Sequence, residues 1–305
     1  MRLATYELQG AVRLGAVVGD RIVDLAALSE RDGGRQVPAD MLAFIDDGAA
    51  NLARARQLLA GPDASRESRP LAEVRLLAPI PRPRQNVMAI GRNYKDHVAE
   101  GARARGQAMV LPEHPVFFTK RASAVIGPEE TIPWDAKLTE GLDWEAELAI
   151  VFGRRGKDIP KDRAYEYVFG YTCGNDISAR DLQSKRHGGQ FFKGKSLDGS
   201  CPLGPWIVTP DDLPNPHDLQ IASRVNGQVK QQANTSMMIF DIPTMVEELS
   251  AGLTLEPGDV FLTGTPSGVG FARTPPEFLR PGDVVEVEVQ GIGVLRNRLV
   301  AAERR

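Results

Sequence analysis

Apolar and polar residues alternate in short runs along most of the chain, a pattern that predicts many β-strands and few helices. Strands are expected at 86–90, 115–119, 144–152, 168–173, 221–225 and 228–230, and short helices near 94–103, 178–183 and 243–251. Asn226-Gly227, between two of these runs, predicts a tight hairpin. This pattern favours an α+β fold, mainly β, built as a mixed β-roll or sandwich rather than a doubly wound parallel sheet.

The first 75 residues differ from the rest and predict a small α/β domain. Residues 17–23 predict two short strands around a Gly-Asp turn, and Asp40 is a suitable N-cap for the helix expected after it. A polar linker comes next, and three prolines within 79–83 exclude a helix or a central strand there. We therefore expect two domains, at residues 1–75 and 76–305.

Composition limits the class of protein. The chain has 305 residues, of which 42% are apolar and 25% charged, and its formal net charge is -3. This balance is typical of a globular protein and gives no basic surplus for binding nucleic acid. Cys173 and Cys201 are too few for a disulfide framework, which favours a reducing compartment. The N-terminus lacks an apolar signal segment, and no apolar run approaches the roughly 18 residues of a membrane span. We expect a cytoplasmic enzyme or binding protein that contacts neither nucleic acid nor membrane.

Two acidic residues in one predicted strand are the first candidates for chemistry. Side chains alternate between the faces of a strand, so Glu145 and Glu147 are expected on the same side. Asp176, which follows the strand at 168–173, could supply a third carboxylate. Three hard oxygen ligands suit Mg²⁺, Mn²⁺ or Ca²⁺ and leave coordination sites for water and a substrate.

Spacing alone does not establish this metal site, because Glu286 and Glu288 repeat the same pattern. We expect that second pair on the solvated face of an antiparallel strand. The same explanation remains open for Glu145 and Glu147 on spacing alone.

His97 and Glu100 form a second candidate pair. If their segment is helical, they are neighbours on one face. A carboxylate beside an imidazole fixes its tautomer and raises its basicity, which is how a general base that activates water is built. A surface ion pair without catalytic function is the alternative.

Two further segments could bind an anion. Lys195, in Gly194-Lys195-Ser196, could hold a substrate carboxylate or stabilise an enolate, although solvated surface lysines are the alternative. The glycine-rich segment 262–270 lacks the Gly-Lys-Ser/Thr ending and the following helix that nucleotide-binding loops require. Its Thr265 and backbone amides could still contact an anion, and ordinary turn glycines are the alternative.

The order of the motifs between residues 85 and 300 resembles the fumarylacetoacetate hydrolase family. The resemblance is carried by Gly91-Arg92-Asn93-Tyr94 with His97 and Glu100, by Asp143 to Ala149, by Gly170 to Gln183, by Gly194-Lys195-Ser196 with Cys201 to Pro205, and by Gly264 to Gly270.

The resemblance implies a β-roll catalytic domain, usually a homodimer, preceded by the small N-terminal domain of the longer members. It implies that Glu145, Glu147 and Asp176 bind Mg²⁺ or Mn²⁺, with Ca²⁺ as a further candidate, and that the His97–Glu100 pair lies on a lid. The catalytic residues would be His97, Glu100 and Lys195. The substrate contacts would be Arg92, Tyr94, Lys120, Gln183 and Thr265.

The first functional hypothesis is a metal-dependent hydrolase that cleaves the C–C bond of an acylpyruvate or another 2,4-dioxo acid through a metal-bound enolate. His97, assisted by Glu100, would activate water, and Gln183 or Lys195 would stabilise the oxyanion. The alternative is an isomerase, tautomerase or decarboxylase of 2-oxo or 2-hydroxymuconate-type acids in aromatic degradation, such as a 2-hydroxyhepta-2,4-diene-1,7-dioate isomerase or an oxaloacetate decarboxylase. A non-catalytic binding protein of the same fold is a third hypothesis, and the intact set of candidate residues argues against it.

Overall fold

The computed structural model describes residues 1–303, and its largest sheet has 12 strands. Ten of them follow one path, in the order β4 (Ser68–Pro70), β3 (Arg21–Asp24), β2 (Ala11–Val18), β1 (Arg2–Leu8), β14 (Cys201–Val208), β12 (Val168–Asn175), β11 (Ala146–Phe152), β17 (Val260–Leu262), β6 (Val87–Gly91) and β7 (Val116–Lys120). Off this path, β5 (Arg75–Leu76) pairs with β1 and β8 (Val125–Ile126) pairs with β14.

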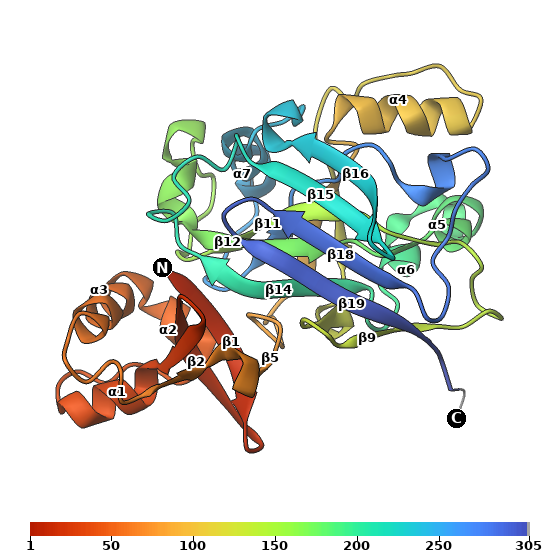
Figure 1. Cartoon of the computed structure of the whole chain (residues 1–305). Coiled ribbons are helices and arrows are strands. Elements are labelled where there is room, and N and C mark those ends of the chain that lie inside the picture. Colours follow the sequence, from red (N-terminus) through yellow and green to blue (C-terminus); the bar gives the residue numbers. More distant parts are fainter. Residues whose placement is uncertain (304–305) are drawn as a thin grey trace.

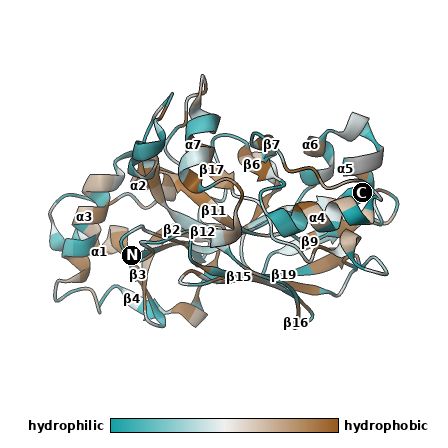
Figure 2. Ribbon diagram, turned by 90° about the horizontal axis from the view of Figure 1, so that it is seen from above, coloured by the Kyte–Doolittle hydropathy of each residue, from teal (hydrophilic) through white to brown (hydrophobic). Residues whose placement is uncertain are grey.

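A second sheet of five strands packs against the centre of the first. Its order is β16 (Gln228–Asn234), β15 (Gln220–Val225), β18 (Val284–Val289), β19 (Gly293–Ala301) and β9 (Thr131–Trp134). One buried apolar cluster lies between the two sheets and includes Leu148 and Ile150 of β11 and Val287 of β18. The mainly β architecture with two packed sheets confirms the predicted fold class. In Figure 2, the ribbon is brown around β6 and β17 and largely teal on helix α4 (Lys95–Ala104).

The N-terminal part continues the large sheet. Strands β1, β2 and β3 form a meander, which confirms the two strands expected around Gly19-Asp20. Helices α1 (Leu25–Asp32), α2 (Met41–Asp46) and α3 (Gly48–Leu59) pack against it, and Asp40 caps α2 by accepting a hydrogen bond from Ala43 N, as expected. Strand β1 pairs with β14, so this part lies beside the rest in Figure 1 as an extension of one sheet. The division at residue 75 stays a prediction.

The hairpin expected at Asn226-Gly227 is confirmed. Both residues have positive φ, 52° and 77°, and they join β15 to β16. On β18, Val285, Val287 and Val289 are buried, while Glu286 and Glu288 are half-buried on the other face, as predicted for a strand with one solvated side.

Two local expectations were wrong. The strand expected over 144–152 begins only at Ala146, because Glu145 N donates to the Asn175 side chain at 3.1 Å rather than to a strand partner. Residues 178–179 form the short strand β13, paired with β10 (Leu142–Asp143), and helix α5 begins only at Arg180 and ends at Lys185.

The remaining α-helices belong to the part of the chain after residue 75. Helix α4 confirms the helix expected near 94–103 and α7 (Ile242–Ser250) the one near 243–251, whereas α6 (Phe191–Lys195) was not predicted. Short 3₁₀ helices are found at Leu71–Glu73, Ala122–Ala124, Lys161–Tyr167, His187–Gly189, Thr235–Met237 and Gly270–Ala272. Within residues 1–303, no helix has the length and apolar character that a bilayer-spanning helix needs.

Candidate metal centre and substrate pocket

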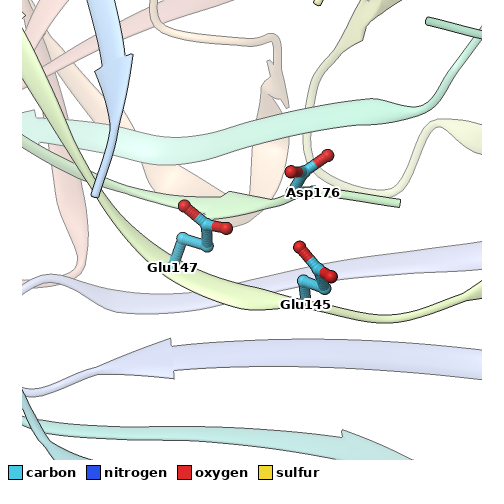
Figure 3. A group of neighbouring side chains, drawn as sticks. All are labelled: Glu145, Glu147 and Asp176. Atoms are coloured by element: carbon cyan, nitrogen blue, oxygen red, sulfur yellow. The ribbon is translucent and has the colours of Figure 1, made fainter. Parts of the chain in front are cut away.

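Glu145, Glu147 and Asp176 converge at the ends of two neighbouring strands (Figure 3). Strands β11 and β12 are antiparallel, with Glu147 opposite Gly174, and Asp176 follows β12 directly. Asp176 N donates to Glu145 O at 2.9 Å, which fixes the two ligand-bearing segments against each other. One oxygen from each carboxylate lies within 4.8 Å of the others, and the three side chains are at most 5% exposed.

Buried cations compensate two of these carboxylates. Lys195 Nζ lies 2.8 Å from Glu145 Oε2 and 2.5 Å from Asp176 Oδ2, and Lys120 Nζ lies 2.6 Å from Asp176 Oδ1. Burial lowers the pKa of Lys195, but the charges of Asp176 and Glu145 outweigh this effect and raise it. Burial likewise raises the pKa of Glu145, but Lys195 and Arg180 outweigh it, so Glu145 stays ionised.

Glu147 has a different environment. Glu147 Oε2 accepts a hydrogen bond from the backbone amide Gly264 N at 2.7 Å. None of the described lysines and arginines forms an ion pair with Glu147. Burial, together with the charges of Asp176 and Glu145, raises the pKa of Glu147 well above its usual value. Three converging oxygen donors with one uncompensated negative charge match the requirements of a hard divalent cation, so the residues fit the metal expected here.

Asp143 and Arg180 support this centre, and the sequence analysis did not single them out as site residues. Arg180 Nη1 lies 2.7 Å from Glu145 Oε1 and Arg180 Nε lies 2.8 Å from Asp143 Oδ2. Asp143 also accepts hydrogen bonds from Gly270 N and Phe271 N, and the Arg180 guanidinium stacks over the Phe271 ring. Both residues lie within motifs that carried the resemblance, but only the structure shows that they form a buried ion pair.

The expected contact between His97 and Glu100 is present on α4. His97 Nδ1 is 2.9 Å from Glu100 Oε1, and Glu100 Oε2 accepts a hydrogen bond from Gly268 N at 2.8 Å. Glu100 is buried, so the alternative of a solvated surface pair does not apply.

A pocket of about 350 Å³ adjoins the metal centre. Glu145, Glu147 and Lys195 line one part of its wall, and His97 faces the same space. Arg92, Arg105 and Gln183 also line it. Pockets that hold small ligands typically have volumes of this order and combine apolar walls with a few converging polar groups.

The structure brings most of the predicted substrate contacts to this pocket, namely Arg92, Gln183 and Thr265. Lys195 also lines it and lies in a helix, not in the solvated loop considered as an alternative, while Lys193 is exposed. The three N–H groups of Lys195 have partners in Glu145, Asp176 and Ser178, so its catalytic role stays a prediction.

Lys120 and Tyr94 do not line the pocket. Lys120 is fully buried, and its ammonium donates to Asp176 Oδ1, Ile177 O and Lys195 O, which uses all three N–H groups. These bonds orient Asp176, a candidate metal ligand, and the contact of Lys120 with substrate stays a prediction. The Tyr94 hydroxyl is buried behind the pocket and finds no hydrogen-bond partner among the described residues.

Comparisons with known proteins agree with this geometry. The family described as "Fumarylacetoacetate (FAA) hydrolase C-terminal" matches residues 86–300. The oxaloacetate tautomerase YisK of Bacillus subtilis is 42% identical over 306 residues, which cover 98% of this chain and 100% of that protein.

Solved structures are similar over the whole chain. The crystal structure of a putative HpcE protein from Mycobacterium smegmatis has a TM-score of 0.84 at 41% identity, covering 99% of this chain and 100% of that one. Maleylpyruvate hydrolase from Sphingobium sp. SYK-6, in complex with manganese(II) and pyruvate, has a TM-score of 0.79 at 32% identity with the same coverage. This maleylpyruvate hydrolase structure therefore contains both a divalent metal and a 2-oxo acid.

Proposed function

Because the chain belongs to the fumarylacetoacetate hydrolase family, whose members are enzymes, we propose that it interconverts the keto and enol tautomers of a small 2-oxo dicarboxylic acid such as oxaloacetate. The similarity to oxaloacetate tautomerase YisK carries this proposal, because it extends over 98% of this chain and all of that protein. It favours the tautomerase alternative over the hydrolase that was the first hypothesis.

The metal of this enzyme would be Mg²⁺ or Mn²⁺, held by Glu145, Glu147 and Asp176. When bound, the ion would polarise the 2-oxo group of the substrate and stabilise negative charge on its oxygen. Ion pairs hold two of these carboxylates in place, because Lys120 and Lys195 contact Asp176 and Arg180 contacts Glu145.

His97 is the residue best placed to move the proton. Glu100 lies at Nδ1 and keeps the proton on that nitrogen, so that Nε2 is the basic atom. In our proposal Nε2 removes a proton from C3 of the keto form, and the protonated imidazole then delivers it to the oxygen at C2. The bond from Gly268 N to Glu100 holds this pair against the glycine-rich segment.

Arginines at the pocket wall suit the second carboxylate of the substrate. Among the described residues, neither Arg92 nor Arg105 forms an ion pair, although both line the pocket. Burial and the charges of Arg92 and Arg180 lower the pKa of Arg105. An anionic group at this end of the ligand would relieve that repulsion.

A second candidate is the hydrolase that cleaves acylpyruvates. The buried His97–Glu100 pair favours it, because the same pair could activate water, and so does the similarity to maleylpyruvate hydrolase. The two activities differ in their products, since hydrolysis releases pyruvate and tautomerisation does not.

Enol-oxaloacetate supplied to the protein with Mg²⁺ tests both candidates. Malate dehydrogenase consumes only the keto form and reports ketonisation, while lactate dehydrogenase reports pyruvate. We expect ketonisation well above the rate with Mg²⁺ alone, abolished by EDTA and reduced on the order of 10²–10⁴-fold in His97→Ala. A rate equal to that of Mg²⁺ alone would contradict the tautomerase. Pyruvate release from an acylpyruvate would support the hydrolase.

A further inference from the structure

Gln231 joins the second sheet to the metal centre. It lies on β16, is 1% exposed, and uses its whole amide in hydrogen bonds. Its Oε1 accepts from Ala146 N and from Ser223 Oγ, each at 2.9 Å. Its Nε2 donates to Thr265 Oγ1 and to Pro266 O, each at 2.7 Å.

Backbone partners fix the orientation of this amide. Ala146 N can only donate and Pro266 O can only accept, so the oxygen of Gln231 must face Ala146 and its nitrogen must face Pro266. A flipped amide would oppose donor to donor and acceptor to acceptor.

The acceptor side of Gln231 holds the ligand-bearing segment. Ala146 lies between Glu145 and Glu147, where β11 begins. Since Ala146 N is bonded to a side chain of the other sheet, the position of this residue depends on Gln231, and the carboxylates on either side follow it.

The donor side holds the glycine-rich segment that forms the facing wall. Thr265 Oγ1 accepts from Gln231 and donates to Ala146 O at 3.0 Å, which closes a ring of three residues. In the same segment, Gly264 N donates to Glu147 and Gly268 N donates to Glu100. The segment also lies directly on β16, because a Cβ at Gly268 would be 2.2 Å from Lys230 O.

We propose that Gln231 is a positioning residue that sets the separation between the segment 145–147 and the Thr265 segment, and thereby the affinity for the metal and the alignment of the ligand. This inference rests on the metal site of the proposed function but not on the identity of the substrate. Residues that hold metal ligands in place typically change metal affinity or activity about 10–100-fold when they are replaced.

Gln231→Met tests the inference, because methionine has a similar size and removes both halves of the amide. Asn297→Leu is the matched control. Asn297 is a buried amide on β19 that donates to Gly127 O and Glu130 O and is not part of the pocket lining. Both variants lose a buried amide, so both should lower the midpoint of thermal unfolding.

Binding of Mn²⁺ to the full chain without substrate, followed by electron paramagnetic resonance, separates the two variants. We expect about 10–100-fold weaker Mn²⁺ binding in Gln231→Met and an affinity within about twofold of wild type in Asn297→Leu. Should Gln231→Met fail to fold, Gln231→Asn keeps an amide but shortens its reach by one methylene, and weaker Mn²⁺ binding is expected there too.

Wild-type Mn²⁺ affinity in a folded Gln231 variant would overturn the inference, and so would an equal loss in Asn297→Leu. KM and kcat for enol-oxaloacetate provide a second measurement. If Gln231 only stabilised the fold, its replacement would lower the amount of folded enzyme but would leave KM and kcat per folded molecule unchanged. A wild-type chain that binds Mn²⁺ but does not tautomerise oxaloacetate would refute the proposed function and leave this inference intact.

Discussion

At the scale of single residues, the metal centre depends on an imbalance of buried charge. Glu145 and Asp176 have cationic partners, whereas Glu147 faces both of them with only an amide to compensate it. Placing like charges in a dry interior destabilises a protein unless a cation lies between them. The charged form of Glu147 is therefore disfavoured unless a cation or a proton binds beside it, and a divalent metal would relieve this repulsion.

Glu147→Gln should separate metal binding from stability. The amide keeps the shape of the side chain but removes its charge, so Mn²⁺ affinity should fall by more than about 100-fold. In EDTA, the variant should unfold at the same temperature as the wild type or higher, because a neutral amide replaces a carboxyl group whose charged form is disfavoured by burial and by two neighbouring carboxylates. Calorimetry with and without Mn²⁺ measures both effects, and a variant that is stabilised by Mn²⁺ as much as wild type would contradict the assignment.

Arg105 should determine selectivity for a second carboxylate. Removing a charge-assisted hydrogen bond costs about 1.5–3 kcal/mol, so Arg105→Gln should raise the KM for oxaloacetate at least tenfold. The KM for phenylpyruvate, which has no distal carboxylate, should not rise. Arg103→Gln, in the last turn of α4 just before its C-cap residue Arg105 but outside this pocket, is the control. An equal change for both substrates would argue against this role.

At the scale of elements, helix α7 depends on a neutral histidine. His217 Nε2 accepts a hydrogen bond from Ile242 N at 3.0 Å, at the start of α7. Burial lowers the pKa of His217 below its ordinary value of 6.5, although Asp241 opposes the shift. A protonated imidazole could not accept this bond.

The stability that His217 contributes should therefore depend on pH. Because the folded pKa is below the unfolded one, the contribution is complete above about pH 6.5 and is lost as the pH falls through that value towards the folded pKa. The effect should not exceed about 1.4 kcal/mol per pH unit. Urea unfolding between pH 7.5 and 5 should show a steeper loss in wild type than in His217→Asn. His114→Asn, at an exposed position, should follow the wild type.

The elements also show which features can be predicted from sequence. The hairpin at Asn226-Gly227 and the cap at Asp40 follow from a few adjacent residues, and both are present. Helix α6 and the break before Ala146 depend on partners distant in sequence, such as Asn175.

In the candidate site, too, some features could be predicted from sequence motifs, whereas others depend on partners that are distant in sequence. Motif order predicted the three carboxylates and the His97–Glu100 pair, and of these residues Glu145, Glu147 and His97 line one pocket. Motif order could not show that Lys120 is enclosed by acceptors, or that Gln231 reaches the centre from the other sheet, because neither lies close in sequence to its partners.

At the scale of the whole molecule, the N-terminal part and the catalytic part share one sheet and one core. The same buried cluster contains Leu3, Leu14 and Phe44 from the first part and Val151 and Leu262 from the second. Without β1, strand β14 would keep β12 as a partner but expose its other side as an edge of the sheet. Because of these contacts, we expect the two parts on either side of the predicted division to depend on each other for their stability.

Deletion of residues 1–75 should consequently leave an unstable chain. The exposed edge of β14 and the opened core should cause aggregation, since unpaired edges and apolar surface promote it. Size-exclusion chromatography and thermal unfolding of the truncated protein check this. A monodisperse fragment with full Mn²⁺ affinity and ketonisation activity would show that the catalytic part folds alone.

The pairing of β1 with β14 has a consequence for biosynthesis. Leu3 leaves the ribosome long before its partner Ile207 is made. At about 5–20 residues per second, the nascent β1 waits about 10–40 s for that partner to be made. During this interval the first meander presents an open edge to other nascent chains, so the yield of active protein should depend on translation speed and on chaperones that shield β1.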